Sequence, residues 1–144
     1  MQKFDNATKT AKEILIKNGY TCVLCGGGEE YHSVLRGVKP LIDFLDSGKC
    51  FKGFSAADKT VGLGAAHLYI LLGVKSVWAN VMSIPAKDLL EQNGIPVFYE
   101  NLVPFIINRQ GDGKCPIETA VKGVNDSIEA VKVIKQTLEN LKKG

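Results

Sequence analysis

The stretch TVGLGAAHLYILLGVKSVWANVM, residues 60–82, joins a helix rich in small residues to a strand that is apolar along nearly its whole length. Gly62, Gly64 and the two alanines that follow favour close packing at the start of this helix, and Gly73 ends it. The run over 76–82 lacks the alternation of a half-exposed strand and is typical of a strand covered on both faces. The stretch therefore predicts an α/β fold in which the strand over 76–82 is central.

The residues before this stretch predict two further helices and a hairpin. Three consecutive glycines at 26–28 allow a tight turn between two segments of β-favouring residues. The elements expected in order are a helix ending at Gly19, strands over 20–25 and 31–35, a helix over 40–47, and an extended segment over 51–55 that leads to a helix entrance at Asp58.

The residues after the stretch continue the alternation of helix and strand. They predict a helix over 85–92, strands over 96–99 and 103–107, a helix opening at Pro116, and a long amphipathic helix over 124–141. A hairpin followed by alternating helices and strands predicts a three-layer α/β/α sandwich. Its sheet is mixed, with an N-terminal β-hairpin and later parallel strands.

Length and composition bound the class of protein. The 144 residues fit one domain, residues 1–144, and a hydrophobic content of 45% with 23% charged residues is ordinary for a soluble globular chain. The net charge of +3 comes largely from dispersed lysines, which disfavours a nucleic-acid partner. The chain shows neither a secretion signal nor an apolar run of membrane-spanning length, so we expect a cytoplasmic protein without a membrane partner.

The four cysteines do not predict a disulfide scaffold or a metal centre. Cys22 and Cys25 have the spacing of a metal-binding pair, but they lie in a predicted strand, where side chains three apart point to opposite faces. No second cysteine pair or nearby histidine completes a tetrahedral site. We expect free thiols, no metal and no cofactor.

The run NRQGDGKCPIE, residues 108–118, brings a guanidinium, a thiol and a carboxylate around a glycine-rich turn. Cys115 directly precedes Pro116, so it lies where backbone N–H groups converge and a thiolate would be stabilised. Asp58 and Ser83 occupy comparable junctions between a strand and a helix. Such junctions collect at one edge of a parallel sheet, so we expect Asp58, Ser83, Arg109 and Cys115 to share one small-molecule site.

Each candidate residue also has a structural interpretation. Asp58 is either a general base or ligand acceptor, or a helix N-cap. Lys59 either holds a phosphate or is a solvated surface residue. The remaining alternatives are close helix packing for Gly62, an ion pair with Glu118 in place of an anion clamp for Arg109, an inert thiol for Cys115, and a favourable helix-dipole interaction for Glu118.

Three segments together resemble a small bacterial and archaeal family of unknown function within the cytidine-deaminase-like superfamily. They are residues 57–62, 81–83 and 108–118, and the resemblance covers about residues 20–122. It implies a cytidine-deaminase-like fold and a pocket position. Active members of the superfamily carry His-x-Glu and Pro-Cys-x-x-Cys at the first two helix entrances. This chain has Ala57-Asp58-Lys59 and Ser83-Ile84-Pro85 there, so zinc-dependent deamination is not expected.

The sequence leaves three functional hypotheses open. The leading one is a domain that binds a small, nucleotide-like or anionic metabolite through Asp58, Lys59, Gly62, Ser83, Asn108, Arg109, Cys115 and Glu118. The second is a metal-independent enzyme in which Cys115 is the nucleophile and Asp58 or Glu118 moves protons. The third is an oligomerisation module, a homo-oligomer that uses the apolar face of the last helix.

Overall fold

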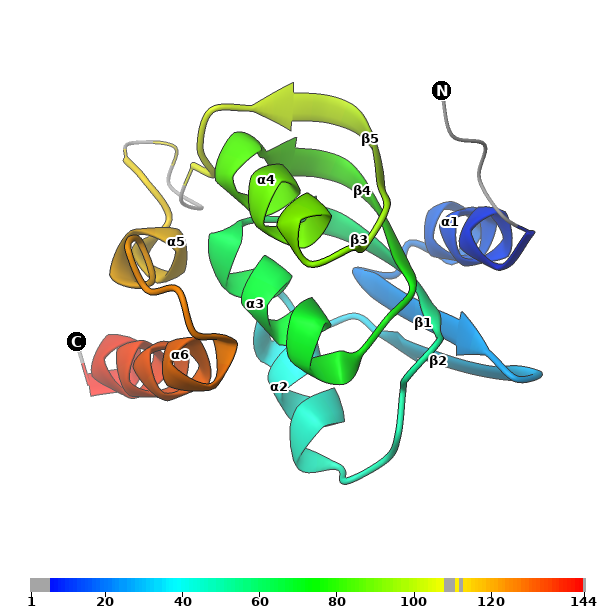
Figure 1. Cartoon of the computed structure of the whole chain (residues 1–144), viewed down its shortest axis with the longest axis horizontal. Coiled ribbons are helices and arrows are strands. Elements are labelled where there is room, and N and C mark those ends of the chain that lie inside the picture. The colour runs from blue at the N-terminus through cyan, green and yellow to red at the C-terminus, as the bar shows by residue number, and fades with distance from the viewer. Residues whose placement is uncertain (1–5, 108–110, 112, 144) are drawn as a thin grey trace.

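The chain folds around one mixed five-stranded sheet with the strand order β2-β1-β3-β4-β5. The structure is a computed structural model that describes residues 6–107, 111 and 113–143 (Figure 1). The strands are β1 (Cys22–Gly26), β2 (Glu29–Ser33), β3 (Ser55–Val61), β4 (Ser76–Ser83) and β5 (Val97–Val103). The helices are α1 (Asn6–Asn18), α2 (Lys39–Asp46), α3 (Leu63–Leu72), α4 (Ile84–Gln92), α5 (Pro116–Ala120) and α6 (Ser127–Lys143).

The direction of the strands decides which strand ends lie at the same edge of the sheet. β3, β4 and β5 are parallel, whereas β1 runs antiparallel to both β2 and β3. Cys22, the first residue of β1, pairs with Asp58 in the middle of β3, and Cys25 pairs with Ser55 at its start. The start of β1 therefore lies at the same edge of the sheet as the carboxyl ends of β3, β4 and β5.

The helices form layers on both faces of the sheet. Helix α1 covers one face, α2, α3 and α4 cover the other, and α5 and α6 pack outside α3 (Figure 1). A small core that includes Trp78 and Ala57 lies under α1, and a larger core lies under α2–α4. The predicted three-layer sandwich with its N-terminal hairpin is confirmed.

The boundaries of two strands and the position of a third differ from the prediction. β3 runs to Val61, because Thr60 and Val61 continue the parallel pairing with β4, so the helix entrance is not at Asp58. The strands expected over 96–99 and 103–107 are one strand, β5, since its pairing with β4 continues through exposed polar residues at the edge of the sheet. β4 has a neighbour on each side, but the middle strand is β3.

The last predicted helix starts later than expected, at Ser127, and its apolar side packs against α3. Ala130 and Ile134 of α6 are fully buried in this contact. Other parts of the same chain therefore cover most of the apolar side of α6.

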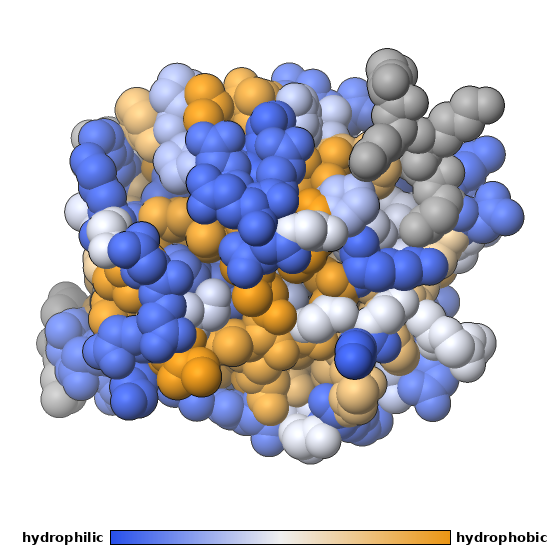
Figure 2. Space-filling model, viewed as in Figure 1, coloured by the Kyte–Doolittle hydropathy of each residue, from blue (hydrophilic) through white to orange (hydrophobic). Residues whose placement is uncertain are grey.

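The surface over α2, α3 and α4 carries apolar atoms near its middle, with hydrophilic side chains around them (Figure 2). Leu45 of α2 and Leu71 of α3 also border a hollow of about 320 Å³ beside residues 49–52. Across the part of the chain that the structure describes, we find no helix with the length and apolar character that crossing a membrane requires.

Candidate functional site

A cavity with a volume of about 460 Å³ lies at the carboxyl ends of the parallel strands, beside the start of β1. Its polar lining residues are Thr21, Arg36, Asp58, Lys59, Thr60, Cys115 and Glu118. Its apolar walls are formed mainly by Val38, Ala65, Ile106, Ile107, Ile117, Leu138 and Leu141. Five of the sequence-predicted site residues line this one cavity: Asp58, Lys59, Gly62, Cys115 and Glu118.

Asp58 is a buried strand residue and not a helix cap, because Gly62 occupies the N-cap position of α3. Its Oδ1 accepts the backbone N–H of Thr60 at 3.2 Å, and its Oδ2 accepts the hydroxyl of Tyr69 at 2.7 Å. Burial raises the pKa of the Asp58 carboxyl from 3.8 to about 7, although these hydrogen bonds act in the opposite direction. Asp58 therefore titrates near neutral pH.

Tyr69 and Cys22 complete a buried chain of polar groups with Asp58, and sequence reasoning missed both. The Tyr69 hydroxyl lies 3.3 Å from the Cys22 sulfur. Burial raises the pKa of the tyrosine and of the cysteine well above their ordinary values, so both side chains keep their protons. Tyr69 projects from α3, eleven residues after Asp58, and no local pattern in an apolar helix marks such a partner.

The Asp58 carboxyl gives the stability of the fold a specific pH dependence. The raised pKa means that the folded state holds a proton that the unfolded state releases between about pH 4 and pH 7. As the pH rises through this range, we expect the free energy of unfolding to fall by up to about 4 kcal/mol, at about 1.4 kcal/mol per pH unit.

The variant Asp58→Asn removes this titration, so its stability should not show that loss. Denaturant unfolding of both proteins from pH 4 to pH 8 measures the difference, with the exposed Asp88→Asn as the matched control. Parallel pH profiles for wild type and Asp58→Asn would contradict the assignment.

Glu118 is a buried structural acceptor for three donors from separate parts of the chain. Its Oε2 accepts the backbone N–H of Leu63 at 2.8 Å and the hydroxyl of Ser83 at 2.6 Å. Its Oε1 accepts the backbone N–H of Ile106 at 2.7 Å. The carboxylate therefore joins α5 to the starts of α3 and α4 and to the segment after β5.

Ser83 is brought to this edge of the sheet, but it serves these contacts instead of lining the cavity. Its hydroxyl donates to Glu118 and accepts the backbone N–H of Ala86 at 3.2 Å, so it is the N-cap of α4. The two glycines that open α3 allow close packing. A Cβ on Gly64 would lie 2.5 Å from the Cγ2 of Ile117, and one on Gly62 would lie 2.9 Å from the Cγ1 of Ile106.

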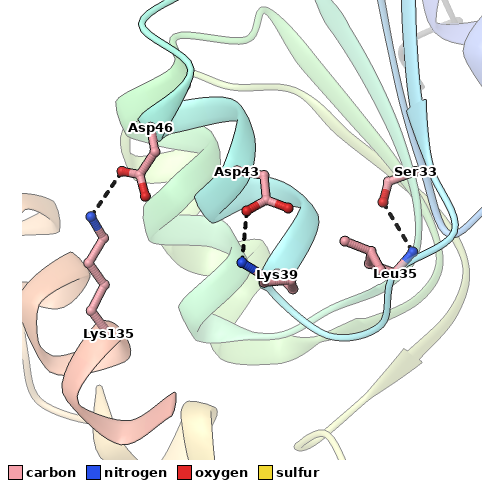
Figure 3. A network of polar contacts seen from close by, with 6 residues as sticks. All are labelled: Ser33, Leu35, Lys39, Asp43, Asp46 and Lys135. Atoms are coloured by element: carbon pink, nitrogen blue, oxygen red, sulfur yellow. Dashed lines mark hydrogen bonds and ion pairs between the residues drawn. The ribbon is translucent and has the colours of Figure 1, made fainter. Parts of the chain in front are cut away.

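Two exposed cations lie at the cavity, Lys59 after Asp58 and Arg36 in the loop between β2 and α2. Arg36 was missed because the candidates came only from strand ends next to helix starts. The loop is held by the backbone N–H of Leu35, which donates to the Oγ of Ser33 at 3.1 Å (Figure 3). Among the described residues, neither Arg36 nor Lys59 forms an ion pair.

The C-terminal helix supplies the remaining wall through Leu138 and Leu141. An ion pair connects this helix to α2, with 2.9 Å between the Nζ of Lys135 in α6 and the Oδ1 of Asp46 in α2 (Figure 3). The position of α6 therefore contributes to the shape of the cavity.

Cys115 is half-buried in the cavity wall, and its backbone N–H donates to the carbonyl of Ile106 at 2.8 Å. Neither histidine is its partner in the described part of the chain. His67 shares a hydrogen bond of 2.9 Å with Ser127, and His32 stacks on Tyr20. The described residues thus place no histidine beside Cys115 as a base, whereas Asp58 and Glu118, the proton carriers of the nucleophile hypothesis, line the same cavity.

Two of the predicted ligand-binding residues, Asn108 and Arg109, lie outside the described residues. Among those that are described, no group of three or more histidine, cysteine or acidic side chains could hold a metal ion.

Comparison with known proteins matches the chain to a family of unknown function. The family model TM1506, a domain of unknown function (DUF1893), matches residues 10–138. A crystal structure of a DUF1893 family protein from Thermotoga maritima superimposes with a TM-score of 0.83 and 25% identity, over 96% of this chain and 92% of that one. The apo structure of dCMP deaminase from the cyanophage S-TIM5 gives a TM-score of 0.45 and 17% identity, over 65% of this chain and 93% of that one. No curated protein matches the chain.

Proposed function

We propose that this chain, which belongs to the DUF1893 family, binds a small anionic, nucleotide-like molecule in the cavity at the carboxyl ends of β3, β4 and β5. The observation that carries the proposal is the pairing of two cations with a concave, mainly apolar cavity at this edge of the sheet. Ligands of open α/β sheets bind at this edge. A volume of about 460 Å³ falls within the roughly 300–1,000 Å³ that is usual for small-molecule sites.

The charges around the cavity favour an anion. Arg36 and Lys59 are exposed and form no ion pair with a described residue, so their charge is available to a ligand. The carboxylate of Glu118 already accepts three hydrogen bonds, which offset its charge, and Asp58 is partly neutral near pH 7. Arg binds a phosphate or carboxylate through two parallel N–H groups.

The walls favour a flat, partly apolar body behind the anionic group. Val38 and Ile117 are buried, while Ile106 and Leu138 are partly exposed, so they present hydrocarbon surface to the cavity. Such surface stabilises a ring by removing apolar area from water. A heterocycle that carries a phosphate combines both requirements.

Calorimetric titration with matched nucleosides and nucleoside monophosphates tests the proposal, with guanosine and GMP as the first pair. We expect GMP to bind at least about tenfold more tightly than guanosine, because hydrogen bonds to charged groups contribute about 1.5–3 kcal/mol each. The double variant Arg36→Gln/Lys59→Gln should lose this advantage.

The control is Lys122→Gln, which removes an exposed cation that does not line the cavity. It should bind GMP like the wild type. Equal affinity of wild type for guanosine and GMP, or an unchanged advantage of GMP in the double variant, would contradict the proposal.

A further inference from the structure

We infer that Asp58 determines the specificity of this site by accepting two adjacent N–H groups from a planar ring of the ligand, as the edge of guanine presents them. The inference rests on the proposed function and names the part of the ligand that faces the buried Asp58. The anionic group then faces Arg36 and Lys59.

Ionised Asp58 can only accept further hydrogen bonds, because a carboxylate has no proton to donate. Each carboxylate oxygen has room for about two hydrogen bonds. Oδ1 uses one for the Thr60 N–H and Oδ2 uses one for the Tyr69 hydroxyl. The backbone N–H of Lys59 also lowers the pKa of Asp58, but it donates to the carbonyl of Thr21 at 3.1 Å. The Thr60 N–H and the Tyr69 hydroxyl are both donors, so the ionised side chain keeps acceptor capacity on each oxygen. A ligand with two parallel N–H groups matches this pair of oxygens, whereas a ring nitrogen without a proton is repelled.

Tyr69 fixes the orientation of this acceptor pair. Its hydroxyl donates to Oδ2 at 2.7 Å and lies 3.3 Å from the Cys22 sulfur, and all three side chains are buried. A carboxylate held by a buried phenol from α3 and a backbone N–H from its own strand keeps one orientation. Such support by surrounding groups makes a hydrogen-bond pattern selective. Tyr69 is therefore a positioning residue for Asp58.

Burial couples this recognition to pH. The pKa of the Asp58 carboxyl is about 7. Asp58 is therefore ionised in about a tenth of the protein molecules at pH 6 and in about nine tenths at pH 8, and only these molecules bind a ligand that needs the ionised form. The groups that face Asp58 or share its cavity are Tyr69 of α3, Cys22 of β1, and the lining residues Arg36, Lys59, Cys115 and Glu118. Tyr69 and Cys22 stay protonated over this range, because burial raises the pKa of both.

Three purine nucleotides with the same sugar and phosphate provide the test. GMP offers two adjacent N–H donors on its ring edge, IMP offers one, and AMP offers an amino group beside an unprotonated nitrogen. We expect affinity to fall in that order, with GMP about 10- to 100-fold tighter than AMP at pH 8, as for a bidentate pair worth about 1–3 kcal/mol. The ratio of GMP to AMP affinity should rise about tenfold from pH 6 to pH 8.

Two variants separate specificity from a loss of folding. Asp58→Asn should bring the ratio of GMP to AMP affinity close to one and make it independent of pH, while GMP stays tighter than guanosine. Tyr69→Phe keeps the ring in the core and removes the donor to Asp58, so it should lower the GMP to AMP ratio without removing the advantage of the phosphate. Thermal unfolding of both variants checks that they fold.

The outcomes distinguish this inference from the proposed function. Equal binding of GMP, IMP and AMP by the wild type, each tighter than its nucleoside, would overturn the inference and leave the proposed function standing. The same holds if Asp58→Asn keeps the wild-type ratio. No binding of any of the three nucleotides would overturn both.

Discussion

Glu118→Ala is expected to lower the free energy of unfolding by about 5 kcal/mol. The substitution leaves the N–H groups of Leu63 and Ile106 and the hydroxyl of Ser83 without their acceptor, and each donor left unsatisfied in a buried place costs about 1–3 kcal/mol. These donors come from three segments that are distant in sequence. The loss should therefore loosen the whole cavity edge of the molecule.

Two further variants show whether the cause is the lost acceptor. Glu118→Gln keeps the shape but replaces one acceptor oxygen by an NH₂ group, so we expect an intermediate loss of about 2–3 kcal/mol. The exposed Glu129→Ala, in the first turn of α6, should change stability by less than about 0.5 kcal/mol. Denaturant unfolding measures all three. A cost for Glu118→Ala no larger than that of Glu129→Ala would contradict the structural role.

Removal of residues 124–144 is expected to yield insoluble or largely unfolded protein. The truncation removes α6, whose side chains Ala130 and Ile134 are fully buried against the core, together with Val124 and Leu138 at its border. Each large apolar side chain contributes about 1.5–3 kcal/mol when buried. The total approaches the 5–15 kcal/mol stability of an ordinary domain.

Point substitutions on α6 test the same packing without removing the helix. Ile134→Ala should lower the free energy of unfolding by about 2–5 kcal/mol, because it opens a cavity between α6 and α3. The matched control is Ile128→Ala on the same helix, where the side chain is 61% exposed, and it should change stability by less than about 0.5 kcal/mol. A soluble truncated chain of wild-type stability, or equal effects of the two substitutions, would contradict the packing.

The layers of the fold were predictable because local patterns specify them. Three glycines at 26–28 mark the hairpin turn, Gly73 ends α3, and Asn93-Gly94 ends α4. Gly73 has a φ of 77°, a conformation that glycine adopts without a steric penalty. The membership of a family of unknown function was likewise indicated by three short motifs and is confirmed.

The local role of Asp58 was not predictable, because a polar Asp-Lys pair before a glycine also fits a helix entrance. Pairing with β4 extends the strand past this point, and strand pairing is a property of the whole sheet. Its partner Tyr69 follows eleven residues later, on a helix that is apolar nearly all round. Buried hydrogen bonds of this kind leave no periodic signal.

The contacts of Glu118 depend on tertiary structure for the same reason. An acid in the first turn of a helix suggests an interaction with that helix alone. Its partner Leu63 lies 55 positions away, at the start of a different helix. The grouping of Asp58, Lys59, Gly62, Cys115 and Glu118 at one edge did follow from the sequence, whereas their roles toward a ligand stay predictions.

A crystal structure of the protein soaked with GMP tests whether the cavity binds a nucleotide in the proposed orientation. We expect the phosphate within hydrogen-bond distance of Arg36 and Lys59, and the ring between the walls that include Val38 and Ile117. A GMP bound elsewhere on the molecule, or a phosphate turned away from both cations, would contradict it.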